Sequence, residues 1–294
     1  MQQARVAWFI MVHHKPDQLA WLLNALSDPA DTIIVHVDLK SRLGLKRDRR
    51  GLMKAVRALC AGRPNVRFLR SRFTNWGGWS LSRTLLDAMR LALRVDAGWT
   101  HFVNLSGQCY PLKPLERIRR EMAEAQDAVM VEMRPFDSLP PDDWHLNWHP
   151  MLELPVRALK LPGRRRPPRG FALTHKGSQW VVLPRAFCTW AVDAPLTRRV
   201  SAYLRHLLLS DELVVQALAL NGPFRDRIRP YRRHIVWPGP RTLTLEDLPA
   251  IEEGDAWFGR KFDLSVDVGV LDALAAEIGA PPGPRPVPER DDSR

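Results

Sequence analysis

VAWFIMVHHKPDQLAWLLNAL, residues 6–26, is followed after a short gap by TIIVHVDLKS, residues 32–41. The continuous apolar run 6–12 is typical of a strand that is buried on both faces of a parallel sheet. Pro16 favours the start of a helix over residues 16–26, and the β-branched run 32–37 indicates a second strand. A strand, a helix and a strand in this order predict a βαβ unit with parallel strands.

The same alternation continues along the chain. Apolar runs predict further strands at 66–69, 101–105, 128–133 and 179–183, and helical spacing predicts helices at 80–95, 114–126, 195–208 and 211–220. We therefore expect the α/β class, with a mainly parallel central sheet, helices on both faces, and one domain over residues 1–280. The segment 135–168, rich in Pro, Trp and Arg, is expected to be a surface loop, and the Pro-rich residues 281–294 a disordered tail.

Cysteine usage and hydropathy limit where the protein works. Its three cysteines, Cys60, Cys109 and Cys188, are far apart in the sequence, which excludes a zinc ribbon and favours a reducing compartment. No run approaches the roughly 18–20 apolar residues of a membrane span, and His13 and His14 follow the first apolar run where a cleavage site would need small residues. We expect a cytoplasmic protein, with peripheral contact to the cytoplasmic face of the membrane left open.

The charge is strongly positive, with 44 basic against 32 acidic residues and a net charge of +12. Because most of the basic residues are arginine, the charge suits a phosphate-bearing ligand, and it would also suit nucleic acid or an anionic membrane surface. A solvated surface and biased composition are the plain alternative. The basic residues do not gather on one predicted helix and form no nucleic-acid motif, so no nucleic-acid partner is expected.

Polar clusters follow four of the predicted strands. In an open parallel sheet, ligands bind beyond the carboxyl ends of the strands, so these clusters are expected to converge on one site. Asp38 could accept hydrogen bonds from a nucleotide base or ribose, or it could be a helix cap or turn residue. The clusters are His13–His14–Lys15, His36–Val37–Asp38, Asn75–Trp76–Gly77–Gly78–Trp79 and Ser106–Gly107–Gln108–Cys109–Tyr110–Pro111.

Two later motifs carry charged side chains. The sequence Ser210–Asp211–Glu212 suits a helix N-terminus capped by Ser210, and one of its carboxylates could also act as a general base on a hydroxyl group. His145 and His149 have the spacing of zinc ligands on one helical face, but no Glu follows the first His and Pro150 adjoins the second. We therefore predict no metal site there.

Six blocks, in order, resemble the core-2/I-branching N-acetylglucosaminyltransferases, a family that includes the peptide O-xylosyltransferases. The resemblance implies a Rossmann-like nucleotide-sugar glycosyltransferase fold of the GT-A type. It also implies a metal-independent, inverting reaction that moves GlcNAc or xylose from a UDP-sugar to a hydroxyl group and forms a β-linkage. The blocks are VHHKPDQLAWLLNAL with HVDLKS (12–41), WGGWSLSRTLLDAM (76–89), HFVNLSGQCYPLKP (101–114), GSQWVVLPRAF (177–187), SDELVVQALALNGPF (210–224) and FGRKFD (258–263).

The resemblance also assigns roles to residues. It implies that Glu212 is the catalytic base, and that Lys261 and an upstream arginine, Arg233 or its rival Arg241, face the diphosphate. The other residues expected to contact the UDP-sugar lie in the matching blocks or after the predicted strands, namely His13, Asp38, Trp76, Gly77, Trp180 and Arg260.

The diphosphate of the donor is expected to be neutralised without a metal. Many nucleotide-sugar transferases hold a divalent ion with an Asp-x-Asp motif, which this sequence lacks; the nearest match is Glu253–Gly254–Asp255. Fixed cations must then stabilise the leaving group, and Arg260–Lys261, flanked by Phe258 and Phe262, could supply them. The alternative is that these cations only pack over aromatic faces at the surface.

The departures from the family concern the acceptor. The membrane anchor, stem and disulfides of animal members are not seen, Cys109 stands where many relatives have Asp, and Gly259 where many have Ala. The chain looks like a short bacterial member, whose acceptor is expected to be a glycan or lipid-linked saccharide. Two alternatives stay open, namely a basic nucleic-acid-binding protein and a family member that binds sugar nucleotide without turnover.

Overall fold

The structure, a computed structural model, describes residues 3–45, 50–237 and 239–285. This described part of the chain forms a seven-stranded sheet with the order β12-β6-β11-β4-β1-β2-β3. All neighbouring strands run parallel except β11, which is antiparallel to both β4 and β6. The α/β class with a mainly parallel sheet is therefore confirmed. The strands are β1 (Val6–Val12), β2 (Thr32–Val37), β3 (Val66–Phe68), β4 (His101–Ser106), β6 (Val129–Met130), β11 (Val182–Pro184) and β12 (Ile228–Arg229).

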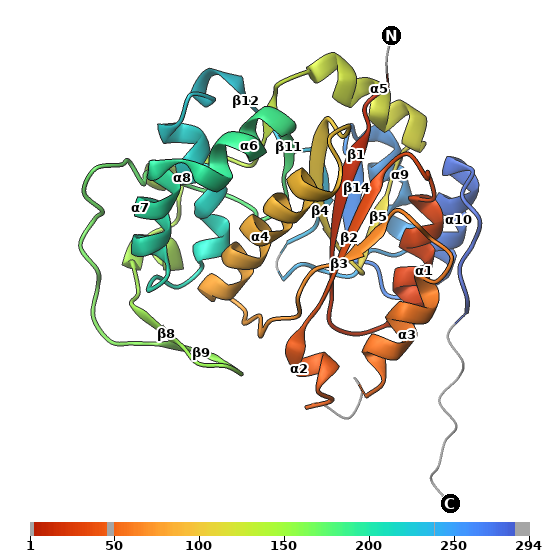
Figure 1. The fold of residues 1–294 in the computed structure, drawn as a ribbon, viewed down its shortest axis with the longest axis horizontal. Helices are drawn as coiled ribbons and strands as arrows, with labels where there is room; N and C mark the ends of the chain where they lie inside the picture. The colour runs from red at the N-terminus through yellow and green to blue at the C-terminus, as the bar shows by residue number, and fades with distance from the viewer. Residues whose placement is uncertain (1–2, 46–49, 238, 286–294) are drawn as a thin grey trace, which may run out of the picture.

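Helices cover both faces of the sheet (Figure 1). The helices α1 (Pro16–Ala25), α3 (Leu52–Leu59) and α5 (Leu115–Ala125) pack on one face, and α4 (Trp79–Val95), α6 (Arg185–Asp193), α7 (Pro195–Leu204) and α8 (Val214–Asn221) on the other. Successive side chains of a strand point to opposite faces. In β1, Trp8 and Ile10 therefore pack into the core under α1, α3 and α5, and Phe9 packs into the core under α4, α6, α7 and α8. The continuous apolar run of β1 is the consequence of this double burial.

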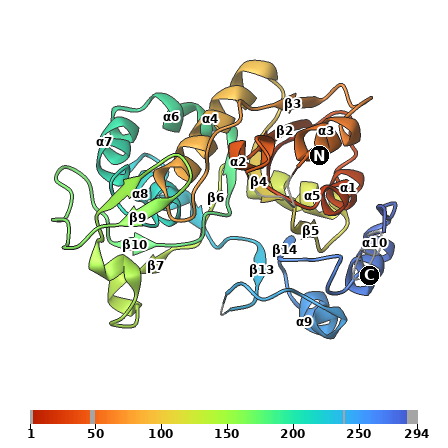
Figure 2. The ribbon, with the colours of Figure 1, turned by 90° about the horizontal axis from the view of Figure 1, so that it is seen from below.

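A smaller three-stranded sheet lies beside the main one (Figure 2). It consists of β13 (Arg233–Ile235), β14 (Phe258–Arg260) and β5 (Cys109–Pro111), and it is accompanied by α9 (Leu248–Glu253) and α10 (Gly269–Ile278). Since β5 follows β4 closely, the pairing of Arg260 with Cys109 brings the end of β14 to the carboxyl end of β4. This pairing positions the predicted basic pair.

The first residues of the predicted disordered tail differ from that expectation. The carbonyl oxygens of Pro282 and Pro284 accept hydrogen bonds from Asn24 Nδ2 at 3.1 Å and Trp21 Nε1 at 3.0 Å, so residues 281–285 lie against α1. The rest of the expected tail, residues 286–294, lies outside the described residues.

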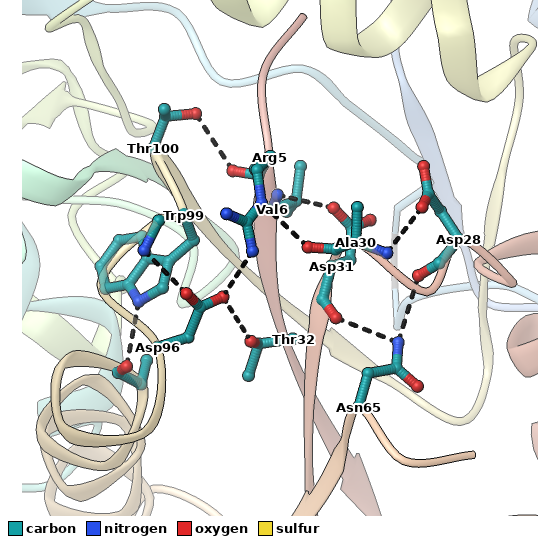
Figure 3. Close-up of polar contacts among 12 residues, drawn as sticks. Arg5, Val6, Asp28, Ala30, Asp31, Thr32, Asn65, Asp96, Trp99 and Thr100 are labelled. Carbon is teal, nitrogen blue, oxygen red and sulfur yellow. Dashed lines mark hydrogen bonds and ion pairs between the residues drawn. The ribbon is translucent and has the colours of Figure 1, made fainter. Parts of the chain in front are cut away.

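At the end of the main sheet where β1 and β2 begin, which lies opposite the carboxyl ends of the parallel strands, the polar side chains are paired with other residues of the chain (Figure 3). Asp31 accepts hydrogen bonds from the Val6 amide at 2.8 Å and from Trp8 Nε1 at 2.7 Å. Asp96 accepts from Arg5 at 3.0 Å and from Thr32 Oγ1 at 2.9 Å. These carboxylates fix the strand ends and loops of this edge, whereas the polar clusters singled out in the sequence lie at the carboxyl edge.

The segment 135–168 is more ordered than the predicted surface loop. It contains the hairpin of β8 (Met151–Glu153) and β9 (Ala158–Lys160) and a 3-10 turn at Trp144–Asn147, and β7 (Arg134–Pro135) pairs with β10 (His175–Lys176). Most residues of the hairpin are partly exposed on both faces, so the sequence lacks the alternation that would indicate a strand. None of the helices in the described ranges is long and apolar enough to cross a membrane.

Candidate active site

A cleft at the carboxyl edge of the sheet consists of two cavities of about 270 and 410 Å³. The two cavities adjoin, because both are lined by Trp76, Gln179, Trp180 and Arg260. The predicted convergence of the polar clusters is therefore observed. The first cavity is also lined by residues that follow or end β1, β2 and β4, namely His13, His36, Asp38 and Ser106, and the second by Glu132, Lys176, Glu212 and Lys261.

The first cavity is organised around Asp38, whose carboxylate is already heavily hydrogen-bonded. Its Oδ1 accepts from the Lys40 and Ser41 amides at 2.9 and 3.3 Å and thereby caps the short helix α2 (Leu39–Arg42), at the bottom of Figure 1. Its Oδ2 accepts from the Thr74 amide at 2.9 Å and from the Thr74 hydroxyl. Asp38 thus acts as a helix cap, the second of the two roles foreseen, and at the same time it joins two loops that line the cavity.

The two histidines of this cavity differ in their surroundings. Nε2 of the buried His36 accepts a hydrogen bond from the Arg72 amide at 3.1 Å, and burial lowers the pKa of His36 to about 4, so the ring is neutral near pH 7. His13, directly after β1, places its ring 3.9 Å from that of His14. The neutral His36 ring and the Asp38 carboxylate on this side of the cavity suit an uncharged ring system with hydrogen-bond donors better than a phosphate.

The wall between the two cavities carries the predicted basic pair. The Arg260 guanidinium lies 4.6 Å from the centre of the Trp180 ring and donates a hydrogen bond to the Ser106 hydroxyl. Lys261 lines the second cavity, and its Nζ has no hydrogen bond or ion pair with the residues that the structure describes. Phe258 and Phe262, on either side of the pair, are fully buried. The buried rings of Phe258 and Phe262 therefore fix the backbone of the pair, and both cationic side chains line the same cleft.

The two upstream arginines do not line this cleft. Arg233 is buried 4.8 Å from the centre of the Phe258 ring and donates to the carbonyl oxygens of Asn104 at 3.0 Å and Val181 at 3.2 Å; burial lowers its pKa to about 10. Arg241 pairs with the Asp247 carboxylate through both terminal nitrogens, one of them at 3.0 Å. Of the basic residues that the sequence suggested for the diphosphate, the structure thus places Arg260 and Lys261 at the cleft, and Arg233 and Arg241 elsewhere.

Gly77 supports the site from outside the cleft. Its φ of +67° lies in the left-handed region that favours glycine, and a Cβ atom there would lie 3.1 Å from the Leu208 side chain. Its carbonyl oxygen accepts a hydrogen bond from the Leu209 amide at 2.8 Å. This contact joins the loop that carries Trp76 to the segment that carries Glu212.

The segment around Glu212 differs from the predicted helix N-terminus. Residues Ser210–Glu212 form a 3-10 turn, α8 begins only at Val214, and the Ser210 hydroxyl makes no cap but lies 3.3 Å from the Ser82 hydroxyl in the core. The prediction of Ser210 as the helix cap was therefore wrong. The turn separates the two acids: Asp211 points into the protein, and the Glu212 side chain, 30% exposed, lines the second cavity.

Three residues that the sequence did not assign to a site surround the Glu212 carboxylate. Nε2 of His145 lies 3.2 Å and Nζ of Lys176 4.0 Å from the same Glu212 oxygen. Behind them, Asp143 accepts hydrogen bonds from His145 Nδ1 at 2.8 Å and from Lys176 Nζ at 3.0 Å. The sequence signal at this place was the H-x-x-x-H spacing of His145 and His149, which is typical of zinc ligands on a helix rather than of a partner for Glu212. Within residues 3–45, 50–237 and 239–285, no group of three His, Cys, Asp or Glu could hold a metal ion.

Large aromatic side chains stand at the mouth of the cleft. Trp76 is 71% exposed, and its ring meets the ring of Trp144, 49% exposed, edge to face at 6.1 Å. Trp237 is another exposed tryptophan that lines the second cavity. Exposed aromatic groups beside a cleft mark a binding surface. Trp76 and Trp237 line the cavity that contains Glu212, and Trp144 adjoins it through its contact with Trp76.

The arrangement defines a class of protein. It has a mainly parallel α/β sheet whose carboxyl edge carries a cleft, and the cleft holds fixed cations near a carboxylate. In proteins of this class, ligands bind in the crevice beyond the carboxyl ends of the strands, and fixed cations there suit an anionic group.

Comparison with known proteins gives the family. The model of the "Core-2/I-Branching enzyme" family matches residues 6–248, so the chain belongs to this family, as the six sequence blocks predicted. The chain is 27% identical to human "Xylosyltransferase 2" over 310 residues, which covers 95% of this chain and 34% of the relative. It is 25% identical to the human "Beta-1,3-galactosyl-O-glycosyl-glycoprotein beta-1,6-N-acetylglucosaminyltransferase 3" over 210 residues, 70% of this chain and 45% of the relative.

The chain therefore spans about a third to a half of the length of these curated relatives. Among solved structures, a 4-diphosphocytidyl-2C-methyl-D-erythritol synthase from Anaerococcus prevotii is similar over 74% of this chain and 97% of that chain, with 8% identity and a TM-score of 0.32. A likeness at this level carries no functional argument.

Proposed function

We propose that this protein is an inverting glycosyltransferase that moves a sugar of the GlcNAc or xylose class from a UDP-sugar to a hydroxyl group, without a metal ion. The observation that carries the proposal is that Glu212, Arg260 and Lys261 line one cavity of the cleft. A carboxylate and two cations are the groups that a hydroxyl acceptor and a diphosphate leaving group require. The names of the relatives, which describe xylosyl and N-acetylglucosaminyl transfer, support the same class.

The donor fits the cleft in one direction. The uncharged base and ribose would occupy the first cavity, beside His13, His36 and Asp38, and the diphosphate would lie at the wall that carries Arg260 and Lys261. The sugar would then enter the second cavity, between Trp180 and Glu212. The short sequence Arg260–Lys261 would supply two positive charges to the diphosphate, and the absence of an Asp-x-Asp motif in the sequence favours this mode over a metal.

The chemical step follows from this placement. Glu212 takes the proton of the acceptor hydroxyl, and the oxygen attacks the anomeric carbon from the face opposite UDP. The bond between the anomeric carbon and the diphosphate oxygen breaks as the new bond forms, which inverts the configuration and gives a β-linkage from an α-linked donor. Lys261 and Arg260 stabilise the negative charge that develops on the departing UDP.

The acceptor would approach over the tryptophans at the cleft mouth. Trp76 and Trp144 offer broad, exposed ring faces, which suit the apolar faces of a glycan or lipid-linked saccharide. The positive charge of the chain would allow peripheral contact with an anionic membrane from the cytoplasm.

The test is a thermal-shift screen of UDP, UDP-GlcNAc and UDP-xylose, with and without EDTA, followed by measurement of UDP release with a panel of simple glycosides. We expect stabilisation by UDP-sugars and turnover that survives EDTA. Activity that EDTA abolishes and manganese restores would contradict the metal-free diphosphate site, and a chain that UDP-sugars do not stabilise would contradict the function itself.

A further inference from the structure

The surroundings of Glu212 are more elaborate than a single base requires. His145 is buried, with only 3% of its side chain exposed, although it comes from the irregular segment between β7 and β8. Its Nε2 lies 3.2 Å from the Glu212 carboxylate but makes no hydrogen bond to it, and it has no hydrogen-bond partner among the described residues. Buried polar atoms in folded proteins are nearly always paired, so an unpaired ring nitrogen beside a carboxylate calls for a reason.

Asp143 fixes which nitrogen of His145 carries a proton. Burial works to raise the pKa of Asp143, but hydrogen bonds from the His145 amide and ring and from Lys176 outweigh it and lower the pKa to about 2. An ionised carboxylate only accepts hydrogen bonds, so His145 Nδ1 must donate to it. The other nitrogen, Nε2, then faces Glu212, and it can hold a proton for that carboxylate.

The charged side chains around His145 can stabilise a proton that Nε2 receives during the reaction. The Asp143 and Glu212 carboxylates face His145 from two sides, and Lys176 Nζ lies between them, 3.0 Å from one and 4.0 Å from the other. Asp211, whose pKa is raised to about 8 mainly by burial, adds no full charge near neutral pH, and Glu132, whose pKa is also raised by burial, lies near the opposite charge of Arg134. Asp143, Glu212 and Lys176 together carry one net negative charge at rest, so a proton taken from the acceptor can be held on His145 Nε2 without giving this group of side chains a net positive charge.

We propose that His145 is a positioning residue that aligns Glu212 and receives the proton that Glu212 takes from the acceptor hydroxyl. The inference rests on the proposed function of Glu212 as the base. In the balanced step, the hydroxyl proton moves to Glu212 as the acceptor oxygen bonds to the anomeric carbon, and the same proton then moves from Glu212 to His145 Nε2. The Nδ1 proton stays in its hydrogen bond to Asp143, whose carboxylate stabilises the imidazolium. After UDP and product leave, the proton returns from His145 Nε2 to the partly exposed Glu212 carboxylate and passes from there to solvent, which restores the site.

The variant His145→Gln distinguishes a residue that accepts a proton from one that only holds Glu212 in place. Glutamine in place of His145 could still donate a hydrogen bond to Glu212 and hold it in place, but it cannot take a proton. We therefore expect His145→Gln to lower kcat by about 10-fold or more, within the roughly 10²–10⁴-fold that a general base contributes. The KM for the donor should stay within about twofold of the wild-type value, because His145 lines neither of the two cavities that would hold the nucleotide and its sugar.

The experiment compares His145→Gln, the control His149→Gln and Glu212→Gln. His149, four residues along, packs its ring 6.4 Å from that of Trp144 and makes no ion pair with Glu212. Release of UDP from UDP-GlcNAc and UDP-xylose is measured between pH 5 and 9, with p-nitrophenyl glycosides or water as the acceptor. We expect the acid limb of the kcat profile to change in His145→Gln alone among the histidine variants. A His145→Gln enzyme with normal kcat and an unchanged acid limb would overturn the proposal.

A second measurement needs no turnover. The ring proton on His145 Nδ1 should give a low-field proton resonance, because it is shared with an ionised carboxylate at 2.8 Å. This resonance should vanish in Asp143→Asn or His145→Gln and shift in Glu212→Gln. A resonance whose position does not change in Glu212→Gln would show that His145 and Glu212 are not coupled, and it would contradict the proposal. If instead Glu212→Gln keeps full turnover, the base itself is misassigned, and that result is distinct from a failure of His145.

Discussion

Lys261→Ala tests the diphosphate site with little risk to the fold. Lys261 Nζ makes no hydrogen bond or ion pair with the described residues, so its removal breaks no internal contact of that atom. A charge-assisted contact to phosphate contributes about 1.5–3 kcal/mol. At 1.36 kcal/mol per tenfold change, the loss should weaken UDP binding by roughly 10- to 150-fold.

The assay is calorimetric titration with UDP at low and at physiological salt, beside thermal unfolding of the free protein. Lys54→Ala, on the exposed side of α3, serves as the matched control, and its affinity for UDP should not change. The melting temperature of Lys261→Ala without ligand should lie close to that of the wild type. Unchanged UDP affinity in Lys261→Ala would refute the assignment, and the same loss in Arg233→Ala or Arg241→Ala would move the role to that arginine.

Two further predictions concern stability. Glu153 accepts hydrogen bonds from the Ser80 amide at 2.9 Å and from Asn75 Nδ2 at 3.1 Å at the start of α4, so Glu153→Gln should lower the free energy of unfolding by about 1–3 kcal/mol in urea titration. The control Glu124→Gln, exposed on α5, should change the free energy of unfolding by less than about 0.5 kcal/mol. Equal effects of the two substitutions would contradict a stabilising role of Glu153 at the start of α4. Burial, together with the negative charges of Glu212 and Glu153, raises the pKa of Asp211 from 3.8 to about 8. Between pH 4 and 8, the folded chain therefore keeps a proton on Asp211 that the unfolded chain has lost, and the contribution of Asp211 to the free energy of unfolding falls as the pH rises through this range. Asp211→Asn should flatten that fall, and a wild-type slope in this variant would show that Asp211 titrates normally.

The parts of the fold that depend on local pattern could be predicted. The bounds of β1 and β2 follow from runs that are apolar because both faces of the sheet are covered. The ends of these strands were also enough to place His13 and Asp38 at one edge. Local sequence could not show that β8 and β9 pair, since their side chains are partly exposed and carry no alternation.

The parts of the site that depend on tertiary contacts could not be predicted. His145 and Glu212 are 67 positions apart in the sequence and come into contact only through the tertiary fold, so neither local sequence predicts the contact. Likewise, Arg233 and Arg260 each stand next to another basic residue in the sequence, but Arg233 is buried against Phe258 and Arg260 lies over Trp180 at the cleft. The resemblance to the family indicated an upstream arginine, and the packing of β13 on β14 decides which basic side chains reach the cleft.

The most direct test of the account is the turnover of Glu212→Gln with a UDP-sugar donor. Glutamine keeps the shape of the side chain and removes its basicity. UDP release from UDP-GlcNAc or UDP-xylose, in the presence of the acceptor that wild type uses best, should fall by roughly 10²–10⁴-fold, the usual range for a general base, while the affinity for UDP stays near the wild-type value. Near-normal turnover in this variant would contradict the central claim that Glu212 accepts the proton of the attacking hydroxyl.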